Sequence, residues 1–247
     1  MYSWKNARIV CTLLLLLPLV HLAWLLSRDV MATLDASPKV WADEMEAYIA
    51  ADTAMHLPTD PIVVVGGRRV KLWPGLGDLL APRPVLMRGL GNATVNDITY
   101  YYERLIGYYQ PETVVLLPDN SEFHIRDAKS PEELLEAVKD LVKLDGAHEV
   151  TSRFYVFSPL KTPRYPGDAA MIEKSTELLE QWAAGVSRVT ILDANPLLCR
   201  ADGRPNPGFY RTDGVNLNEH GYLRLSVLLE QQLLRDRDSP HGFAVKF

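Results

Sequence analysis

The residues of this chain that could take part in chemistry follow short apolar runs, where strands are expected to end. Arg68 and Arg69 follow the run IVVV, Asn120 follows TVVLL, and Asp213 and Asn216 lie in a later loop. An amide can stabilise a developing oxyanion, and a carboxylate can orient a base. A guanidinium stays protonated in proteins, so it is neither nucleophile nor base. The set therefore indicates charge stabilisation and anion recognition.

The elements that must hold these residues alternate between strand-like and helical patterns. Short apolar runs predict strands at 61–65, 84–87, 113–117, 153–158 and 189–192. Apolar residues at helical spacing predict helices at 38–53, 95–109, 131–144, 169–184 and 218–234. The third of these opens with Ser-Pro-Glu-Glu, a strong helix start. This alternation predicts a parallel sheet covered on both faces, with the ligand crevice beyond the carboxyl ends of its strands.

Four strand-end segments between residues 60 and 235 resemble, in order, the sequence blocks of the SGNH/GDSL hydrolases. Gly66-Gly67-Arg68 stands where the family has Gly-Asp-Ser, and the run RGLG ends in Gly91 at the position of a backbone oxyanion-hole donor. The run PDNS places Asn120 at the position of the side-chain oxyanion donor. DGVN resembles the family's Asp-x-x-His, with Asp213 retained and Asn216 in place of the histidine. The resemblance implies a three-layer, flavodoxin-like α/β domain of about five parallel strands.

The departures from the family pattern remove the groups that ester hydrolysis needs. No Ser, Thr or Cys occurs between Ile62 and Gly75, so a small shift in the alignment recovers no nucleophile. Asn216 has no basic nitrogen, which leaves Arg68, Asp213 and Asn216 as vestigial catalytic positions. Without a nucleophile and base, only residual rate enhancement is expected from the remaining donors. We therefore predict a domain that is not an ordinary esterase.

The replacement residues predict an anion-recognising crevice. Arg68, Arg69 and Arg88 could receive a carboxylate, a phosphate or an acidic side chain, with Gly91 and Asn120 as further donors. The alternative is that Arg68 and Arg69 are solvated or pair with Asp119 and Asp213 and hold the vestigial site together. No cofactor is expected, and no cysteine spacing suggests a metal site.

The first 26 residues predict a membrane anchor. Ile9 to Leu26 form an apolar run of 18 residues, which as a helix spans about 27 Å. Lys5 and Arg8 precede it, so the positive-inside rule places residues 1–8 in the cytoplasm and the domain in the periplasm or cell exterior. A cleaved signal peptide is the alternative, although the run exceeds the usual apolar region and lacks a clean cleavage motif. Residues 27–59 are expected to form a linker and helix, 60–235 the domain, and 236–247 a tail.

Composition narrows the function classes further. A net charge of −5 and a pI near 5.7 argue against a general nucleic-acid binder. The prediction is a single-pass, non-catalytic SGNH-like domain that binds membrane or envelope proteins, a glycan or an anionic ligand. Two alternatives remain: an esterase using Ser121 with His124 or His220, acting for example on acyl groups of envelope polysaccharides, and a purely structural subunit whose crevice is plugged by its own arginines.

Overall fold

A five-stranded parallel sheet forms the centre of the domain in the computed structural model, which describes residues 14, 16–22, 24, 37–124 and 128–238. The strands are β1 (Ile62–Gly66), β2 (Val85–Gly89), β3 (Thr113–Leu117), β4 (Arg153–Phe157) and β5 (Val189–Leu192). Their order is β2-β1-β3-β4-β5, and each neighbouring pair is parallel. This is the flavodoxin-like order predicted from the sequence.

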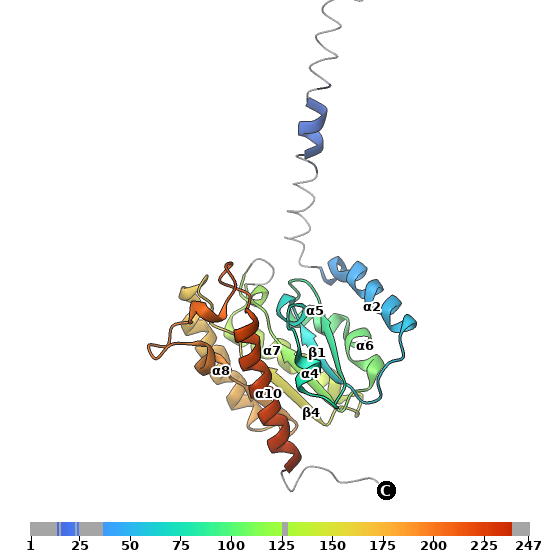
Figure 1. Cartoon of the computed structure of the whole chain (residues 1–247), viewed down its shortest axis with the longest axis vertical. Coiled ribbons are helices and arrows are strands. Elements are labelled where there is room, and N and C mark those ends of the chain that lie inside the picture. Colours follow the sequence, from blue (N-terminus) through green and yellow to red (C-terminus); the bar gives the residue numbers. More distant parts are fainter. Residues whose placement is uncertain (1–13, 15, 23, 25–36, 125–127, 239–247) are drawn as a thin grey trace, which may run out of the picture.

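Helices cover both faces of the sheet (Figure 1). The α-helices are α2 (Ala42–Ala54), α3 (Arg68–Lys71), α4 (Leu76–Leu79), α5 (Val95–Tyr100), α6 (Tyr102–Leu105), α7 (Pro131–Gly146), α8 (Ala169–Ala183), α9 (Asn195–Leu198) and α10 (Glu219–Asp238). Short 3-10 helices lie at Pro38–Trp41, Gly107–Tyr109, Asn120–Glu122, Pro166–Asp168 and Pro207–Phe209. The three-layer arrangement agrees with the prediction.

Alternate residues of the strands enter two separate cores, although the strands are almost entirely apolar. Val63 and Val65 of β1 pack with α5, α7 and α8, whereas Ile62 and Val64 pack with α3, α4 and α10. This follows from the two-residue period of a strand, which sends successive side chains to opposite faces. The core on each face of the sheet therefore holds one group of helices in place near the strand ends.

The expected helix at 95–109 is broken into α5, α6 and a short 3-10 helix. The backbone at Tyr101 and at Ile106 departs from α-helical geometry, and Gly107 directly follows Ile106. Tyr102 can then donate a hydrogen bond to Asp145 Oδ1 at 3.0 Å, while Tyr109 turns toward α2. Tertiary hydrogen bonds of the tyrosines thus override the helical periodicity.

The segment predicted to anchor the chain in a membrane lies largely outside the described residues. Residues 1–8 and most of the predicted anchor at 9–26 are not described, and nor are 239–247 of the predicted tail. Within the described part of the chain, no helix combines the length and apolar character required to cross a membrane.

Candidate functional site

The carboxyl ends of β1 and β3 meet the 213–216 loop in a hydrogen-bonded cluster of polar residues, which we call the strand-end crevice after its place in the fold and define by Arg69, Asp119, Asn120, Asp213 and Asn216. The Arg69 guanidinium lies at its centre with only 1% of the residue exposed. Its Nη2 donates to Asn120 Oδ1, and also to the carbonyl of Val215 at 3.1 Å. The Arg69 side chain thus links Asn120, the predicted oxyanion donor, to the 213–216 loop, which holds the predicted remnant of the catalytic dyad.

Close packing of β1 against β3 places this arginine. A Cβ on Gly66 would lie 2.3 Å from the Leu117 carbonyl oxygen, and one on Gly67 would lie 2.6 Å from Asp119 Oδ2. The two glycines therefore let Asp119 reach the start of α3, where its Oδ2 accepts from the Arg69 backbone N–H at 3.3 Å. Asp119 Oδ1 lies 3.8 Å from Arg69 Nε, giving a buried ion pair.

Arg68 and Arg69 occupy different environments, although both were predicted to bind an anion. Arg68 is exposed, and its side chain makes no hydrogen bond or ion pair within the described residues. Arg69 points inward because the next residue, Val70, is fully buried in the core beside α10. The Tyr222 hydroxyl further fixes this turn by donating to the Arg69 carbonyl at 2.9 Å. Arg69, one position beyond the nucleophile position assigned from sequence, is therefore the residue that fills the crevice.

Asp213 and Asn216, the predicted remnant of a catalytic dyad, are hydrogen-bonded to each other. Asn216 Nδ2 donates to Asp213 Oδ2 at 2.7 Å, as an imidazole N–H would donate to an orienting carboxylate. Burial by itself raises the pKa of Asp213. The hydrogen bonds from the Asn216 side chain and from the Val215 and Asn216 backbone N–H groups outweigh it and lower that pKa. Asp213 is thus ionised and held in place, while the amide beside it cannot accept a proton from a nucleophile.

Gly91, the predicted backbone oxyanion donor, is covered by α2. Its N–H donates to Glu44 Oε2 at 3.1 Å, and the same oxygen accepts from Lys71 Nζ at 2.8 Å. A Cβ on Gly91 would lie 2.2 Å from Cζ3 of Trp41, so the indole packs directly against the glycine. The sequence indicated a linker and helix here but not this contact. Trp41, Glu44, Tyr48 and Asp52 recur every three or four residues, a spacing that marks one helix face and could have suggested docking.

Arg88, the third predicted anion-binding arginine, lies beneath the other end of α2. Its Nη2 is 2.5 Å from Asp52 Oδ1, and its Nε donates to the Tyr109 hydroxyl at 2.7 Å. The guanidinium carbon lies 4.9 Å and 4.8 Å from the ring centroids of Tyr48 and Tyr109. Burial and the Asp52 hydrogen bond raise the pKa of Tyr109 to about 12. The anion that Arg88 binds in this structure is the chain's own Asp52.

The residues of the alternative esterase do not form a nucleophile–base pair. Ser121 is buried, and its hydroxyl donates to the Ala93 carbonyl at 3.1 Å. His124 Nε2 lies 2.6 Å from Asp168 Oδ2, and its ring stacks on Tyr165. In the described part of the chain, no hydrogen bond joins Ser121 to His124 or to His220.

Cys199 is also unsuited to act as a nucleophile. Burial raises the pKa of its thiol, which favours the unreactive protonated form.

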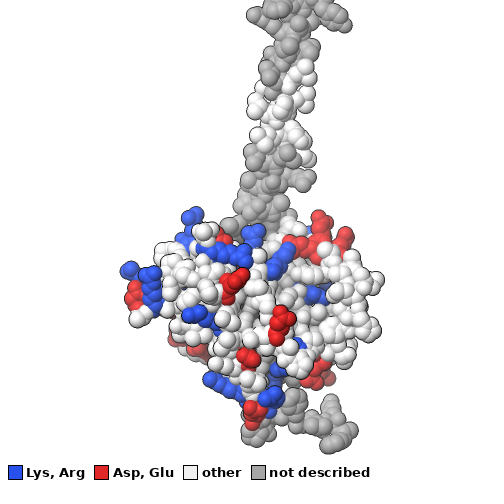
Figure 2. Space-filling view, viewed as in Figure 1, with Lys and Arg blue, Asp and Glu red and all other residues white. Residues whose placement is uncertain are grey.

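Exposed basic side chains gather along the edge of the domain where the strands end. Arg68, Arg164 and Arg211 are exposed, and the latter two flank the 213–216 loop through backbone hydrogen bonds to Gly214 and Asn216. Figure 2 shows basic side chains over this upper end of the domain, with acidic side chains over the adjacent start of α2. The strand-end edge of the domain therefore presents positive charge next to the acidic helix α2.

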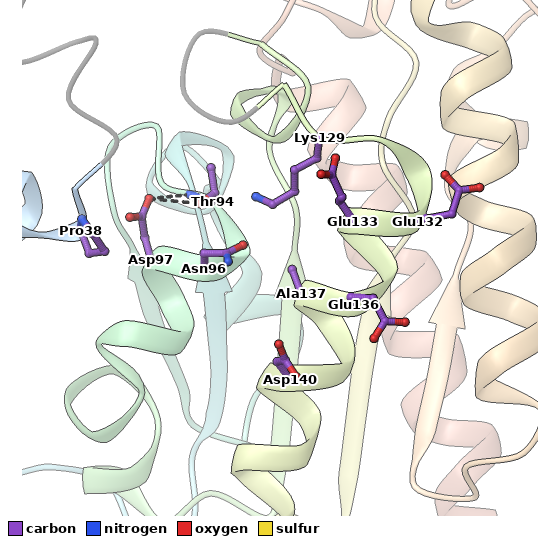
Figure 3. Close-up of a pocket in the computed structure, with 10 residues that line it drawn as sticks. All are labelled: Pro38, Thr94, Asn96, Asp97, Lys129, Glu132, Glu133, Glu136, Ala137 and Asp140. Carbon is purple, nitrogen blue, oxygen red and sulfur yellow. Dashed lines mark hydrogen bonds between the residues drawn. The ribbon is translucent and has the colours of Figure 1, made fainter.

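A separate hollow of about 610 Å³ lies between the starts of α5 and α7 (Figure 3). Half of its ten lining residues are acidic, namely Asp97, Glu132, Glu133, Glu136 and Asp140, and Lys129 lies among them. Asp97 and Glu133 belong to the capping boxes of the two helices. Among the described residues, no group of three His, Cys, Asp or Glu side chains could hold a metal ion. We assign these carboxylates to helix capping and surface charge.

Comparison with solved structures identifies the fold. The domain superposes on a protein from Streptococcus pneumoniae with a TM-score of 0.69 and 16% identity, covering 87% of this chain and 99% of that one. A GDSL-like lipase from Bacteroides thetaiotaomicron gives 0.63 and 14% identity, covering 77% and 97%. An acetylxylan esterase from Geobacillus stearothermophilus gives 0.55 and 12%, covering 72% and 96%. No family model and no curated protein sequence matches the chain.

The chain therefore has the fold of the SGNH/GDSL hydrolases, and the resemblance read from its four sequence blocks is confirmed at the level of the fold. At these identities the likeness concerns the fold alone. What the domain does depends on the residues in its crevice.

Proposed function

We propose that this chain is a catalytically inactive SGNH-like domain that acts as an extracytoplasmic binding or accessory subunit of a membrane or envelope complex. One observation carries the inactive state: the buried Arg69 guanidinium spans the crevice from Asn120 to Val215. It occupies the space between the oxyanion-type amide and the Asp213 loop, where an ester carbonyl would have to lie. A guanidinium cannot attack that carbonyl, and Asn216 cannot act as a base.

Membrane anchoring is part of the proposal and rests on the apolar segment. The described side chains of that segment are exposed and need a non-aqueous partner: Leu14, Leu16, Leu17, Leu19, Val20, Leu22 and Trp24. A single helix in the bilayer could pack against other membrane subunits as well as tether the domain. Periplasmic or extracellular placement follows from Lys5 and Arg8 before the apolar run.

Ester turnover tests the inactive state. Full-length protein in detergent would be incubated with a fluorophosphonate probe and with p-nitrophenyl acetate, beside the Ser121→Ala and Asn120→Ala variants. We expect no labelling and the same background hydrolysis in all three proteins. Labelling or turnover that disappears in Ser121→Ala would overturn the proposal and favour the esterase alternative.

Co-purification tests the accessory role. Tagged protein extracted from its native membrane with mild detergent is expected to retain membrane or envelope proteins in fixed proportion. Recovery of the chain in good yield, with no co-purified protein and no retained glycan, would contradict a binding role.

A further inference from the structure

Helix α2 buries few apolar side chains, although Tyr48 and the preceding Trp41 pack against the core while partly exposed. Among its thirteen residues only Met45 is buried, while Ile49 is 38% exposed and Met55, just after the helix, is 58% exposed. Segments with few buried apolar contacts open locally at low free energy. α2 is therefore suited to leave the domain without unfolding it.

The contact at the start of α2 has the chemistry of a bound ligand. Glu44 Oε2 accepts from both the Gly91 N–H and Lys71 Nζ, and the Glu44 and Lys71 side chains remain 31% and 42% exposed. A backbone N–H and an ammonium converging on one oxygen form a carboxylate site, occupied here by a side chain of the same chain.

The far end of α2 is held by a different kind of contact. Asp52 pairs with Arg88, and both side chains are only 8% exposed. Tyr48 donates to the Gly89 carbonyl at 2.6 Å. Because this end is the more enclosed, the exchangeable contact is the one at Glu44, beside the strand-end crevice.

We propose that α2 is an autoinhibitory strap whose Glu44 occupies a carboxylate-binding site made by the Gly91 N–H and Lys71. A ligand carboxylate that enters this site displaces Glu44 and releases the start of the helix. The proposal rests on the proposed binding role of the domain and names the chemical class of a ligand that binds beside the crevice. By linkage, whatever pulls α2 away raises the affinity for the carboxylate, and the reverse also holds.

Hydrogen–deuterium exchange of the full-length protein in detergent tests the strap, with acetate as the probe. In the unaltered protein, acetate should speed exchange in residues 42–54 relative to chloride at equal ionic strength. Glu44→Ala should speed the same exchange about threefold to tenfold without acetate, as expected for loss of one charged hydrogen-bonded contact. In Glu44→Ala, acetate should protect the peptide containing Gly91, and Lys71→Ala added to it should abolish that protection.

Two further variants keep the test decisive. Gly91→Ala leaves both charges in place but would put a Cβ 2.2 Å from the Trp41 ring, so it should also speed α2 exchange. Glu177→Ala breaks an exposed Lys–Glu pair on α8 and should leave α2 exchange unchanged. Unchanged α2 exchange in both Glu44→Ala and Gly91→Ala, or no acetate effect in any protein, would overturn the strap. Because these readouts do not involve esters, their failure is distinguishable from the ester turnover that would overturn the proposed function.

Discussion

Two acid–base contacts meet at the strand ends of this domain, and they differ mainly in burial. At the crevice centre, Arg69 and Asp119 are 1% and 6% exposed. Under α2, Glu44 and Lys71 are 31% and 42% exposed. Both contacts bring a carboxylate and a cation to a group that the sequence assigned to oxyanion binding, Asn120 in the first and Gly91 in the second.

Burial decides whether such a contact is permanent or exchangeable. Removing one member of a buried ion pair leaves a charge that water cannot reach, which is strongly unfavourable. An exposed pair exchanges with water and salt at little cost. The same chemistry can therefore close the centre of the crevice permanently and close its rim reversibly. Four predictions test this contrast.

The largest effect is expected at the crevice centre. Arg69→Ala should lower the free energy of unfolding by about 3–5 kcal/mol, because it leaves Asp119 buried without its counter-ion. Urea denaturation of the full-length protein would measure the change. Arg68→Ala is the matched control and should stay within about 0.5 kcal/mol, since that side chain is exposed. Equal losses of unfolding free energy in the two variants would contradict the assignment of Arg69 as the residue that fills the crevice.

A smaller effect is expected at the enclosed end of α2. Asp52→Asn should cost about 2 kcal/mol, because Arg88 loses a charged partner while α2 can still move aside. The loss should appear chiefly as faster hydrogen exchange in α2. Tyr109→Phe removes a neighbouring hydroxyl but no charge, and it should cost about 1 kcal/mol. A larger loss in Tyr109→Phe than in Asp52→Asn would argue against the ion pair as the main contact.

The rim pair should contribute least among the ion pairs. A double-mutant cycle on Lys71→Ala and Glu44→Ala should give a coupling free energy of at most about 1 kcal/mol. The coupling should shrink as salt is raised, because the pair is partly exposed. A coupling free energy that does not depend on salt and is as large as the stability loss in Arg69→Ala would remove the contrast between the Arg69–Asp119 pair and the Glu44–Lys71 pair.

Asp213 should make a shallow contribution to the dependence of stability on pH. Its pKa is lowered in the folded state, so the stability it contributes is present above its ordinary pKa of about 3.9 and is lost as the pH falls through the lower folded value. Asp213→Asn should remove this part of the acid sensitivity in urea melts at about pH 5 and about pH 3. Asn216→Ala should raise the pKa of Asp213 toward its ordinary value. An unchanged acid response in both variants would show that Asp213 contributes nothing to it.

Much of the fold could be predicted from the sequence because its signals are local. The strand at 113–117 agrees with β3, and the Ser-Pro-Glu-Glu start of α7 forms the predicted capping box, with the Ser130 N–H donating to Glu133 Oε2 at 2.7 Å. The short helices α3 and α4 were not predicted, since four residues give too little periodicity. α3 matters most among these, because it carries both Arg68 and Arg69.

The contacts of α2 could not be predicted for a different reason. Residues 38–53 show a helical pattern, but nothing in that pattern says which part of the domain the helix meets. The contact between Glu44 and Gly91 joins residues 47 positions apart, and tertiary packing, including that of Trp41 against this glycine, brings them together.

The sequence by itself determined the strand-end positions of the polar residues and the lack of a hydroxyl or thiol between Ile62 and Gly75. It also placed an asparagine, Asn216, where the family resemblance predicts a histidine. Only the tertiary structure decided that Arg69 enters the crevice and Arg68 faces solvent. Successive helical residues point about 100° apart, so the directions of their side chains depend on which residue is buried in the core. Here Val70 is buried in the core, and this orientation of the helix directs Arg69 toward Asn120.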